Sequence, residues 1–334
     1  MRFPGHAPYI PKRKRASSSR TDRVSRPVSL ERTMIEIAPY EPRHLMGLLD
    51  VANLHLALVP PRDARLTAPA LETAVTHYER LWLHHYPLEE GETPISHQSL
   101  VATSGGEPVG LITAGWTPDD ERGNICFFIA HPSVPEAADR LLCEAEALLA
   151  AKGCTSIDGS GRSPIGLGWF DLPTTWTHLI EAYERAGFAC YAEWIIMAGR
   201  TDAIPVGPPQ PRLEKPDIRF VEDAEHCEWH LEIRDGEKLV GECDAWGVPP
   251  HLDSCPGFGD WITIEWVGVE EEFQRRGFAF WLMAKQMHYH LRAGRSRAMV
   301  WTEKGNLPAR ALNRRLGLGD GPAIRRFGKS LRSS

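Results

Sequence analysis

The sequence predicts an α/β protein built from two tandem units, and three observations support this prediction. Its 334 residues are enough for about two domains. Short runs of β-branched and aromatic residues alternate with segments whose apolar residues recur at helical spacing. The order of elements then repeats, because Trp116 and Trp246 lie 246 − 116 = 130 residues apart and Gly187 and Gly317 lie 317 − 187 = 130 residues apart. The surrounding sequences also match, GEPVGLITAGW with GEKLVGECDAW and AYERAGF with ALNRRLGL.

The composition excludes several classes of protein. Hydrophobic residues make up 42% and charged residues 25% of the chain, as in soluble globular proteins. The formal net charge of −6, from 38 Lys and Arg against 44 Asp and Glu, argues against a general nucleic-acid-binding protein. No apolar run approaches the roughly 20 residues that span a bilayer, so we expect no membrane segment and a cytoplasmic location. The seven cysteines are scattered and never spaced Cys-x-x-Cys, which favours reduced thiols and no metal site.

Residues 1–33 form a basic segment that we expect to be disordered. The segment contains Lys12-Arg13-Lys14-Arg15 and three consecutive serines, but almost no large apolar residue that a core would need. A nuclear or nucleic-acid-binding signal is the alternative interpretation of the basic cluster. The segment also lacks the apolar core of a secretory signal peptide.

The first unit is expected to span residues 34–200. A short strand opens it, a helix follows Pro42, and a polar helical insertion separates that helix from a β-hairpin. A strand, a long helix closed by Gly153, and then a strand, a helix and a strand complete the unit. The expected elements are 35–38, 45–55, 60–86, 99–103, 109–116, 125–130, 136–151, 156–158, 177–186 and 190–197.

Five prolines mark residues 201–216 as a linker, and the second unit is expected to span residues 217–330. This unit begins with a hairpin that turns at Asp235-Gly236 and continues with a strand and a helix that ends at Gly294. A strand, a helix that stops at Gly317 and a final strand follow. The expected elements are 229–233, 239–246, 261–267, 280–291, 298–302, 308–316 and 323–327.

The stretch VGVEEEFQRRGFA, residues 267–279, predicts an anion-binding turn. It joins the buried strand to the helix and contains a basic, glycine-containing segment. The start of a helix presents unpaired N–H groups and the positive end of the helix dipole, so a phosphate is the natural occupant of such a turn. The alternative is an ordinary connection whose charged residues are solvated.

The second unit resembles the Gcn5-related N-acetyltransferase (GNAT) superfamily. The turn Gln274-Arg275-Arg276-Gly277-Phe278-Ala279 matches the family pattern Gln/Arg-x-x-Gly-x-Gly/Ala at the head of a helix. A second family pattern, Asn-x-x-Ala-x-x-Leu-Tyr-x-x-x-Gly-Phe, is similar to residues 306–318, which begin at Asn306. The first unit resembles the family by its order of elements and by fragments. The resemblance implies two tandem GNAT-like domains, each with a mixed, mostly antiparallel sheet flanked by helices.

In the family this turn binds the pyrophosphate of acetyl-CoA, so the resemblance implies that cofactor here. The amides from Arg275 to Ala279 would hold the pyrophosphate, and Gly277 would let the backbone approach it closely. Asn306 would lie near the pantetheine arm, and Arg310 would reach the phosphates. The cofactor-binding residues that the resemblance implies are therefore Val267, Gly268, Val269, Gln274, Arg275, Arg276, Gly277, Phe278, Ala279, Asn306 and Arg310.

The family transfers the acetyl group directly to an amine, which requires a base to take a proton from the ammonium. Glu265 is the first candidate, because a strand carboxylate flanked by Ile264 and Trp266 would have a raised pKa. A solvent-facing Glu265 is the alternative interpretation. Glu242 and Asp244, on the neighbouring strand, are the alternative bases.

The sequence departs from the family at the general acid, because Asn313 stands where the family has a tyrosine. Asparagine cannot release a proton to a thiolate. Either the thiolate departs unassisted or through water, or a residue such as Tyr289 substitutes, or this unit no longer catalyses. The first unit keeps Tyr183 but lacks a basic, glycine-containing turn at residues 129–136. We expect it to be a degenerate partner that helps to shape the acceptor site.

The resulting hypothesis is an acyltransferase that moves an acetyl group from acetyl-CoA to the amine of a small molecule. One alternative is a non-catalytic acyl-CoA-binding or scaffold protein, and another is an acetyltransferase of a peptide or protein amine. We expect no metal, nucleic-acid or membrane partner, and a monomer or homodimer. The histidines His84, His85, His288 and His290 lack metal-ligand spacing, and the glycine-rich residues 159–168 are expected to form a mobile loop.

Overall fold

The computed structural model describes residues 34–78, 93–118, 120–159, 171–204, 210–223, 227–248 and 250–331. All of these described residues belong to one compact unit. The basic segment 1–33, the histidines His84 and His85, residues 160–168 of the glycine-rich loop and residues 205–209 of the proline-rich linker lie outside them. No helix within the described ranges combines the length and hydropathy needed to cross a bilayer.

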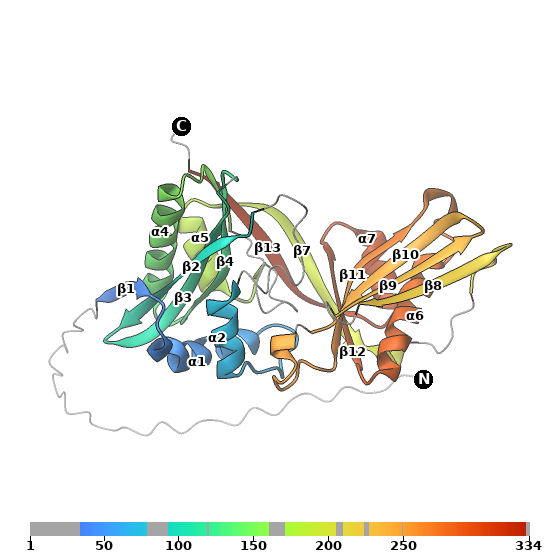
Figure 1. Cartoon of the computed structure of the whole chain (residues 1–334), viewed down its shortest axis with the longest axis horizontal. Helices are drawn as coiled ribbons and strands as arrows, with labels where there is room; N and C mark the ends of the chain where they lie inside the picture. Colours follow the sequence, from blue (N-terminus) through green and yellow to red (C-terminus); the bar gives the residue numbers. More distant parts are fainter. Residues whose placement is uncertain are drawn as a thin grey trace, which may run out of the picture. The chain divides into compact units, whose positions relative to one another are not determined.

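The first half contains the expected strands and helices in the expected order (Figure 1). Of the helical insertion expected at 60–86, the described residues contain a helix at Ala68–Thr76, and residues 79–86 lie outside them. Helices α1 and α4 both pack against β3, and α4 also packs against α5. The two-residue strand β6 was not predicted from the sequence. The elements are β1 (Ile35–Pro39), a 3-10 turn (Pro42–His44), α1 (Leu45–Leu56), α2 (Ala68–Thr76), β2 (Ser96–Ser104), β3 (Glu107–Trp116), β4 (Arg122–Ala130), α4 (Pro135–Ala151), β5 (Ser156–Asp158), β6 (Leu172–Pro173), α5 (Thr177–Arg185) and β7 (Ala189–Arg200).

The second half repeats this order without counterparts of α1, α2 and β6. Only four residues separate β8 from β9, too few for counterparts of α1 and α2. Strand β8 was missed by the sequence analysis, because it is an edge strand whose residues are mostly exposed and show no apolar pattern. The elements are β8 (Pro216–Asp223), β9 (Glu228–Asp235), β10 (Lys238–Trp246), β11 (Trp261–Val269), α6 (Phe278–Arg292), β12 (Arg297–Glu303), α7 (Leu307–Arg315) and β13 (Gly319–Ser330), with 3-10 turns at Thr201–Ala203, Pro250–Leu252 and Glu271–Phe273.

The two halves share one sheet, because each half gives its last strand to the other. The strand order is β1-β2-β3-β4-β5-β13-β7-β12-β11-β10-β9-β8, and β6 pairs with β13. Strand β7 of the first half pairs antiparallel with β12, from Trp194↔Glu303 to Arg297↔Arg200. Strand β13 of the second half pairs with β5 at residues 328–330. The two repeats are therefore joined by hydrogen bonds as well as by the linker.

Two large apolar clusters hold this sheet. The larger cluster belongs mainly to the first half but includes Trp261 and Met299 of the second half. The other lies between α6 and the second half of the sheet, with Trp281 and Leu282 buried against β10 and β11. Complete burial of a side chain of this size stabilises the fold by about 2–3 kcal/mol. Helix α6 thus covers one face of β9, β10 and β11, and the opposite face is the one that lacks α1 and α2 counterparts.

Candidate active site

Strands β11 and β12 separate partway along their length and leave a slot between them. They pair in parallel from Trp261↔Arg297 to Ile264↔Val300, and no pair beyond Ile264 is present between these two strands. Strand β11 nevertheless continues to Val269, held by β10 on its other side. Residues 265–269 therefore have one edge with no strand partner among the described residues. An extended ligand can pair with such an edge as an added strand would.

A β-bulge places Glu265 at the start of this slot. Asp244 of β10 pairs with Trp266 and the next residue, Ala245, pairs with Ile264, so Glu265 has no residue opposite it. A bulge of this kind bends the strand and redirects the side chain of the extra residue. The sequence placed Glu265 on the strand, but a register shift is not visible in an alternation pattern.

Glu265 lies in surroundings that favour its neutral form. The side chain is partly buried, and its Oε2 atom has no hydrogen-bond partner among the described residues. Burial, followed by the negative charges of Asp244 and Glu228, raises the pKa of Glu265 from 4.5 to about 7. A carboxyl group that is about half ionised at neutral pH is well suited to act as a general base.

The two alternative bases are engaged in hydrogen bonds. Asp244 Oδ1 lies 2.6 Å from Nδ1 of His230 on β9. Glu242 Oε1 accepts a hydrogen bond of 3.3 Å from the indole Nε1 of Trp266. The structure thus brings Glu265 and Asp244 together but leaves Glu265 as the carboxylate without a partner at one oxygen.

Two neighbours of Glu265 were missed by the sequence analysis. Glu228 raises its pKa, and His230 bonds to Asp244. Both belong to β9, where they alternate with the buried Trp229 and Leu231. The alternation of polar and apolar residues in β9 could have identified them, because alternate residues of a strand lie on the same face of the sheet as their neighbours on the paired strand.

The predicted anion-binding turn is anchored at both ends by aromatic side chains. Phe273 and Phe278 are both buried, and their ring centroids lie 6.0 Å apart in an edge-to-face contact. Between them, Arg275 has φ of 60° and Gly277 has φ of 92°. Two left-handed residues so close together curve the backbone into a concave nest of N–H groups. The side chain of Gln274 donates to Val269 O at 3.0 Å and ties the turn to the end of β11.

Helix α6 starts directly after this turn and offers its amides to an anion. Its N-cap is Gly277, no side chain caps the helix, and no acidic residue lies in the first turn. The first amides of a helix have no partner within the helix and carry the positive end of its dipole. The turn and the slot therefore fit a ligand with a diphosphate at one end and an extended, hydrogen-bonding arm.

The three arginines predicted to bind the cofactor differ in how free their guanidinium groups are to bind a phosphate. Arg275 is exposed and has no ion pair or hydrogen bond from its guanidinium within the described ranges. Arg276 lies over the rings of Phe273 and Phe278, at 5.3 Å and 5.6 Å from their centroids. Arg310 donates to Lys304 O and to Asp320 Oδ2, each at 3.0 Å. Arg310 would have to give up these bonds to reach a phosphate.

The remaining predicted residues have structural partners. Asn306 caps α7 by accepting a 3.1 Å hydrogen bond from the amide of Ala309. The Asn313 side chain is only 2% exposed, and its Nδ2 atom lies 3.6 Å from the sulfur of Met197. Tyr289 donates to Glu222 of β8 at 2.9 Å. Asn313 is thus a core residue, and the hydroxyl of Tyr289 is bonded to an edge strand.

In the first half, buried side chains occupy the region that corresponds to the slot. The hydroxyl of Tyr183 donates to Gly159 O at 2.9 Å, and its ring contacts those of Phe128, Phe188 and Phe327. His178 Nε2 donates to Ala130 O at 2.8 Å, at the end of β4. The retained tyrosine is therefore part of the core of the first half.

Comparisons with known proteins agree with this geometry. Residues 192–318 match the sequence profile of the Acetyltransferase (GNAT) family. No curated protein sequence matches the chain significantly. A tandem GNAT protein from the clavulanic acid biosynthesis pathway, solved without AcCoA, is 12% identical and has a TM-score of 0.61 over 90% of this chain and 100% of its own.

Two further solved structures have a similar fold. A GCN5-related N-acetyltransferase from Sphaerobacter thermophilus is 14% identical, with a TM-score of 0.59 over 90% of this chain and 96% of its own. A glucosamine N-acetyltransferase region of a fungal GH3 β-N-acetylglucosaminidase is 12% identical, with a TM-score of 0.59 over 90% of this chain and 38% of its own. At these identities the likeness concerns the fold alone. Residues 192–318 thus carry the GNAT family profile, and over nine tenths of its length the chain has the fold of tandem GNAT proteins.

Proposed function

We propose that the second half binds acetyl-CoA and transfers its acetyl group to the amine of a small molecule. One observation carries the proposal: a single strand, β11, has Glu265 at the start of its unpaired edge and leads at its other end into the turn before α6. This arrangement supports a proton-accepting carboxylate, with a pKa of about 7, at one end of the slot and a diphosphate at the other.

The residues of the slot fit the cofactor that the family uses. The amides that follow Arg275 and Gly277 would hold the diphosphate, and residues 267–269 would pair with the pantetheine arm. When bound, acetyl-CoA supplies an activated thioester. The exposed guanidinium of Arg275 adds positive charge where the phosphates would lie.

Glu265 acts as the general base in this proposal. Its ionised form takes a proton from the ammonium of the acceptor and so produces the neutral amine that attacks. Asp244 and Glu228 raise the proton affinity of Glu265 and also attract a cationic acceptor to this face of the sheet. The indole of Trp266, which is 56% exposed, offers this acceptor an apolar surface beside Glu265.

The thiolate leaves without a protein acid in this proposal. Asn313 is buried against Met197, and the hydroxyl of Tyr289 is bonded to Glu222. A thiol has a pKa of about 8.5, so a departing thiolate can take its proton from water. The presence of Asn313 in place of a tyrosine also favours the non-catalytic alternative. Only the acetyltransferase would release free thiol from acetyl-CoA.

The experiment combines cofactor binding with turnover. Calorimetry should show saturable coenzyme A binding to the full chain and its loss in the Gly277→Asp variant and in the Arg275→Ala/Arg276→Ala double variant. A screen of amines with acetyl-CoA should then release free thiol, and the Glu265→Gln variant should bind coenzyme A without turnover. Unchanged binding in both turn variants would exclude the cofactor site, and binding without turnover on any amine would favour the non-catalytic alternative.

A further inference from the structure

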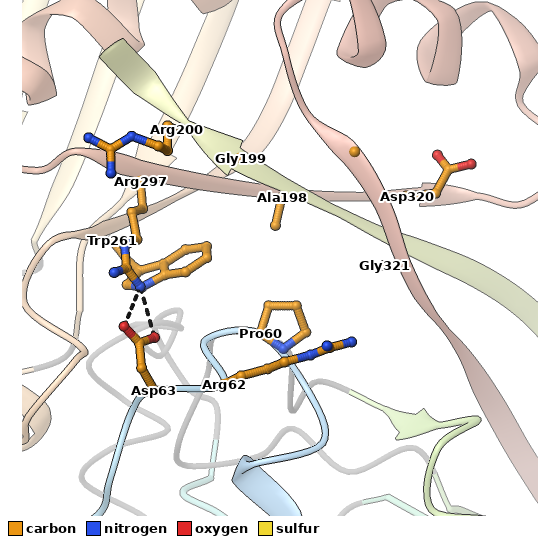
Figure 2. A pocket seen from close by; sticks show the side chains of 11 residues that line it. Pro60, Arg62, Asp63, Ala198, Gly199, Arg200, Trp261, Arg297, Asp320 and Gly321 are labelled. Atoms are coloured by element: carbon orange, nitrogen blue, oxygen red, sulfur yellow. Dashed lines mark hydrogen bonds and ion pairs between the residues drawn. The ribbon is translucent and has the colours of Figure 1, made fainter. Parts of the chain in front are cut away.

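A second pocket lies outside the slot, where β7 and β13 pass from one half of the molecule to the other. Its volume is about 410 Å³, within the range of pockets that hold small molecules. Figure 2 shows the loop with Pro60 and Arg62 on one side, the ends of β7 and β13 on the other, and Trp261 between them. Nothing in the proposed acetyl transfer uses this pocket.

The pocket is separate from the slot. Trp261 and Arg297 begin β11 and β12, so they lie at the ends of these strands opposite to the unpaired edge. Glu265 lies four residue steps along the strand from Trp261, which corresponds to about 13 Å. Thr263 and Met299, which lie between the two places, are 2% and 0% exposed. A ligand in the pocket would therefore leave the slot free.

The walls of the pocket are held in place by contacts between the two halves. Arg297 forms an ion pair with Asp63 of the first half at 2.7 Å and with Asp260 at 3.1 Å. Gly257 packs so tightly on the same loop that a Cβ atom there would lie 2.8 Å from Cα of Ala64. The loop that covers the pocket is thus fixed at two points, and the pocket is preformed.

The charges around the pocket are compensated, with one exception. Asp320 forms ion pairs with Arg310 and Arg314, Arg200 pairs with Asp202, and Arg297 has two carboxylate partners. The guanidinium of Arg62 has no ion pair or hydrogen bond within the described residues, and it lies at the edge of the pocket. The uncompensated charge of the pocket is therefore positive.

The rest of the surface is apolar and suits a flat ligand. The ring of Trp261, the ring of Pro60 and the methyl group of Ala198 face the cavity in Figure 2. Gly319 and Gly321 add backbone without side chains. The indole Nε1 of Trp261 is buried and has no acceptor among the described residues.

We propose that this pocket binds a planar aromatic carboxylate, with its ring between Trp261 and Pro60 and its carboxylate on Arg62. Arginine pairs with a carboxylate through two parallel hydrogen bonds, and aromatic rings stack or meet edge to face. The site goes beyond the proposed acetyl transfer, because it uses none of the residues of the slot. A ligand in this pocket would contact residues of both halves, including the first residues of β11 and β12.

The first half contains the matching position, which provides a control. A pocket of about 320 Å³ lies at the start of β4 and β5, with Arg122 where the second half has Trp261. It contains Tyr191 in the place of Gly321, and no residue of the other half's loops lines it. It lacks the rings of Pro60 and Trp261, so replacement of Arg122 should not affect binding of an aromatic carboxylate at the proposed site.

The test uses 2-naphthoate and its neutral counterpart 2-naphthamide as calorimetric probes of the full chain. We expect 2-naphthoate to bind with a dissociation constant below about 1 mM and to bind at least about 10-fold tighter than the amide. The Arg62→Ala variant should lose this preference for the acid. The Ala198→Leu variant, which fills the cavity, should lose both probes, and the Arg122→Ala variant should bind as the wild type does.

Three results would overturn the proposal. These are no binding of 2-naphthoate, equal binding to the wild type and to the Arg62→Ala variant, and displacement of 2-naphthoate by coenzyme A. Thermal unfolding of each variant shows that it is folded, and the Arg62→Lys variant, which keeps the charge, should retain part of the preference. Because the probes need no acetyl-CoA, this test succeeds or fails independently of the proposed acetyl transfer.

Discussion

The two halves place different residues at the same bulge. In the second half the register between β10 and β11 skips Glu265, and in the first half the register between β3 and β4 skips Cys126. Cys126 is fully buried, whereas Glu265 is partly exposed. The bulge is thus a property of the repeated fold, and the residue type at the bulge decides whether the position can exchange protons.

The segments that follow β11 and β4 also differ between the two halves. Strand β11 leads into a turn with two left-handed residues before α6, whereas α4 follows Val134, with φ of −129°, and begins at Pro135. At the end of β4 the carbonyl of Ala130 is already bonded to His178. The first half has the strands of the fold without the open groups that would bind a cofactor.

The exchange of strands explains why the first half remains necessary. Strand β7 lies between β12 and β13, so the second half has no complete sheet without it. The second half therefore contains the open slot, and the first half supplies a strand and much of the core. Four predictions test this division.

The largest effect is expected from Glu265→Gln. Loss of a general base reduces turnover by roughly 100-fold to 10,000-fold, and coenzyme A affinity should be unchanged. The matched control is Cys126→Ala at the bulge of the first half, which should keep full activity. Steady-state kinetics of both variants with the best amine acceptor provide the measurement. Equal losses in the two variants would contradict the division of roles.

Stability measurements separate this loss from misfolding. The folded-state pKa of Glu265 is raised from 4.5 to about 7, so its neutral form is favoured by folding. The stability associated with this protonation is present below the unfolded pKa and is lost as pH rises through about 7. A difference of about 7 − 4.5 = 2.5 pH units corresponds to about 3 kcal/mol. Denaturation in urea at pH 8 should therefore show Glu265→Gln to be more stable than the wild type.

The next largest effect is expected from Gly277→Asp. A residue with a Cβ atom is strained by about 1–2 kcal/mol at a φ of 92°, and a carboxylate at the head of α6 repels a phosphate. Coenzyme A should bind at least about 100-fold more weakly, as measured by calorimetry. The Gly277→Ala variant should lose only the part of the coenzyme A affinity that is due to backbone strain. Ser133→Asp, at the corresponding turn of the first half, should have no effect, and weaker coenzyme A binding there would indicate a second cofactor site.

A smaller effect is expected on the pH dependence of turnover. Glu265 must be ionised to accept a proton, so kcat/KM should rise with pH and level off above about 7. Asp244→Asn removes a negative neighbour and should move this rise to lower pH, by less than the full return to 4.5, because burial is the larger cause of the raised pKa. Glu242→Gln is the control, and a rise that moves in this variant but not in Asp244→Asn would assign the base elsewhere.

The sequence was sufficient to predict most of the order of elements and a glycine-containing turn before α6, whose binding of an anion stays a prediction. Both depend on local patterns: the helical spacing of α6, the glycine at residue 277 and the alternation of the hairpins. The match between the repeats also identified the positions of Tyr183 and Asn313, which lie on corresponding helices. Local patterns decide these features because each is set by residues that are neighbours along the chain.

The strand exchange, the bulge and the second pocket could not be predicted in this way. Strands β7 and β13 could each pair within their own half or with the other half, and their pattern of side chains is the same in both cases. The pattern of side chains also does not specify the hydrogen-bond register. Arg62 and Trp261 are 199 residues apart (261 − 62 = 199), and only the packing of both halves brings them to one cavity. Each of these features depends on contacts between distant segments.

The smallest effect is expected from Tyr183→Phe in the first half. The tyrosine hydroxyl donates to Gly159 O, and the side chain is fully buried. Removing the hydroxyl leaves a buried carbonyl without its partner, which costs about 1–2 kcal/mol. Urea denaturation should detect this loss, while coenzyme A affinity and turnover should be unchanged.

This variant distinguishes a retained structural residue from a retained catalytic one. The ring of Tyr183 keeps its contacts with Phe128 and Phe188 in the phenylalanine variant, so the fold should remain intact. If Tyr183 were the acid that replaces Asn313, turnover would fall much more than stability. A fall in turnover with unchanged stability would therefore assign acetyl-transfer chemistry to the first half and overturn the division between the two repeats.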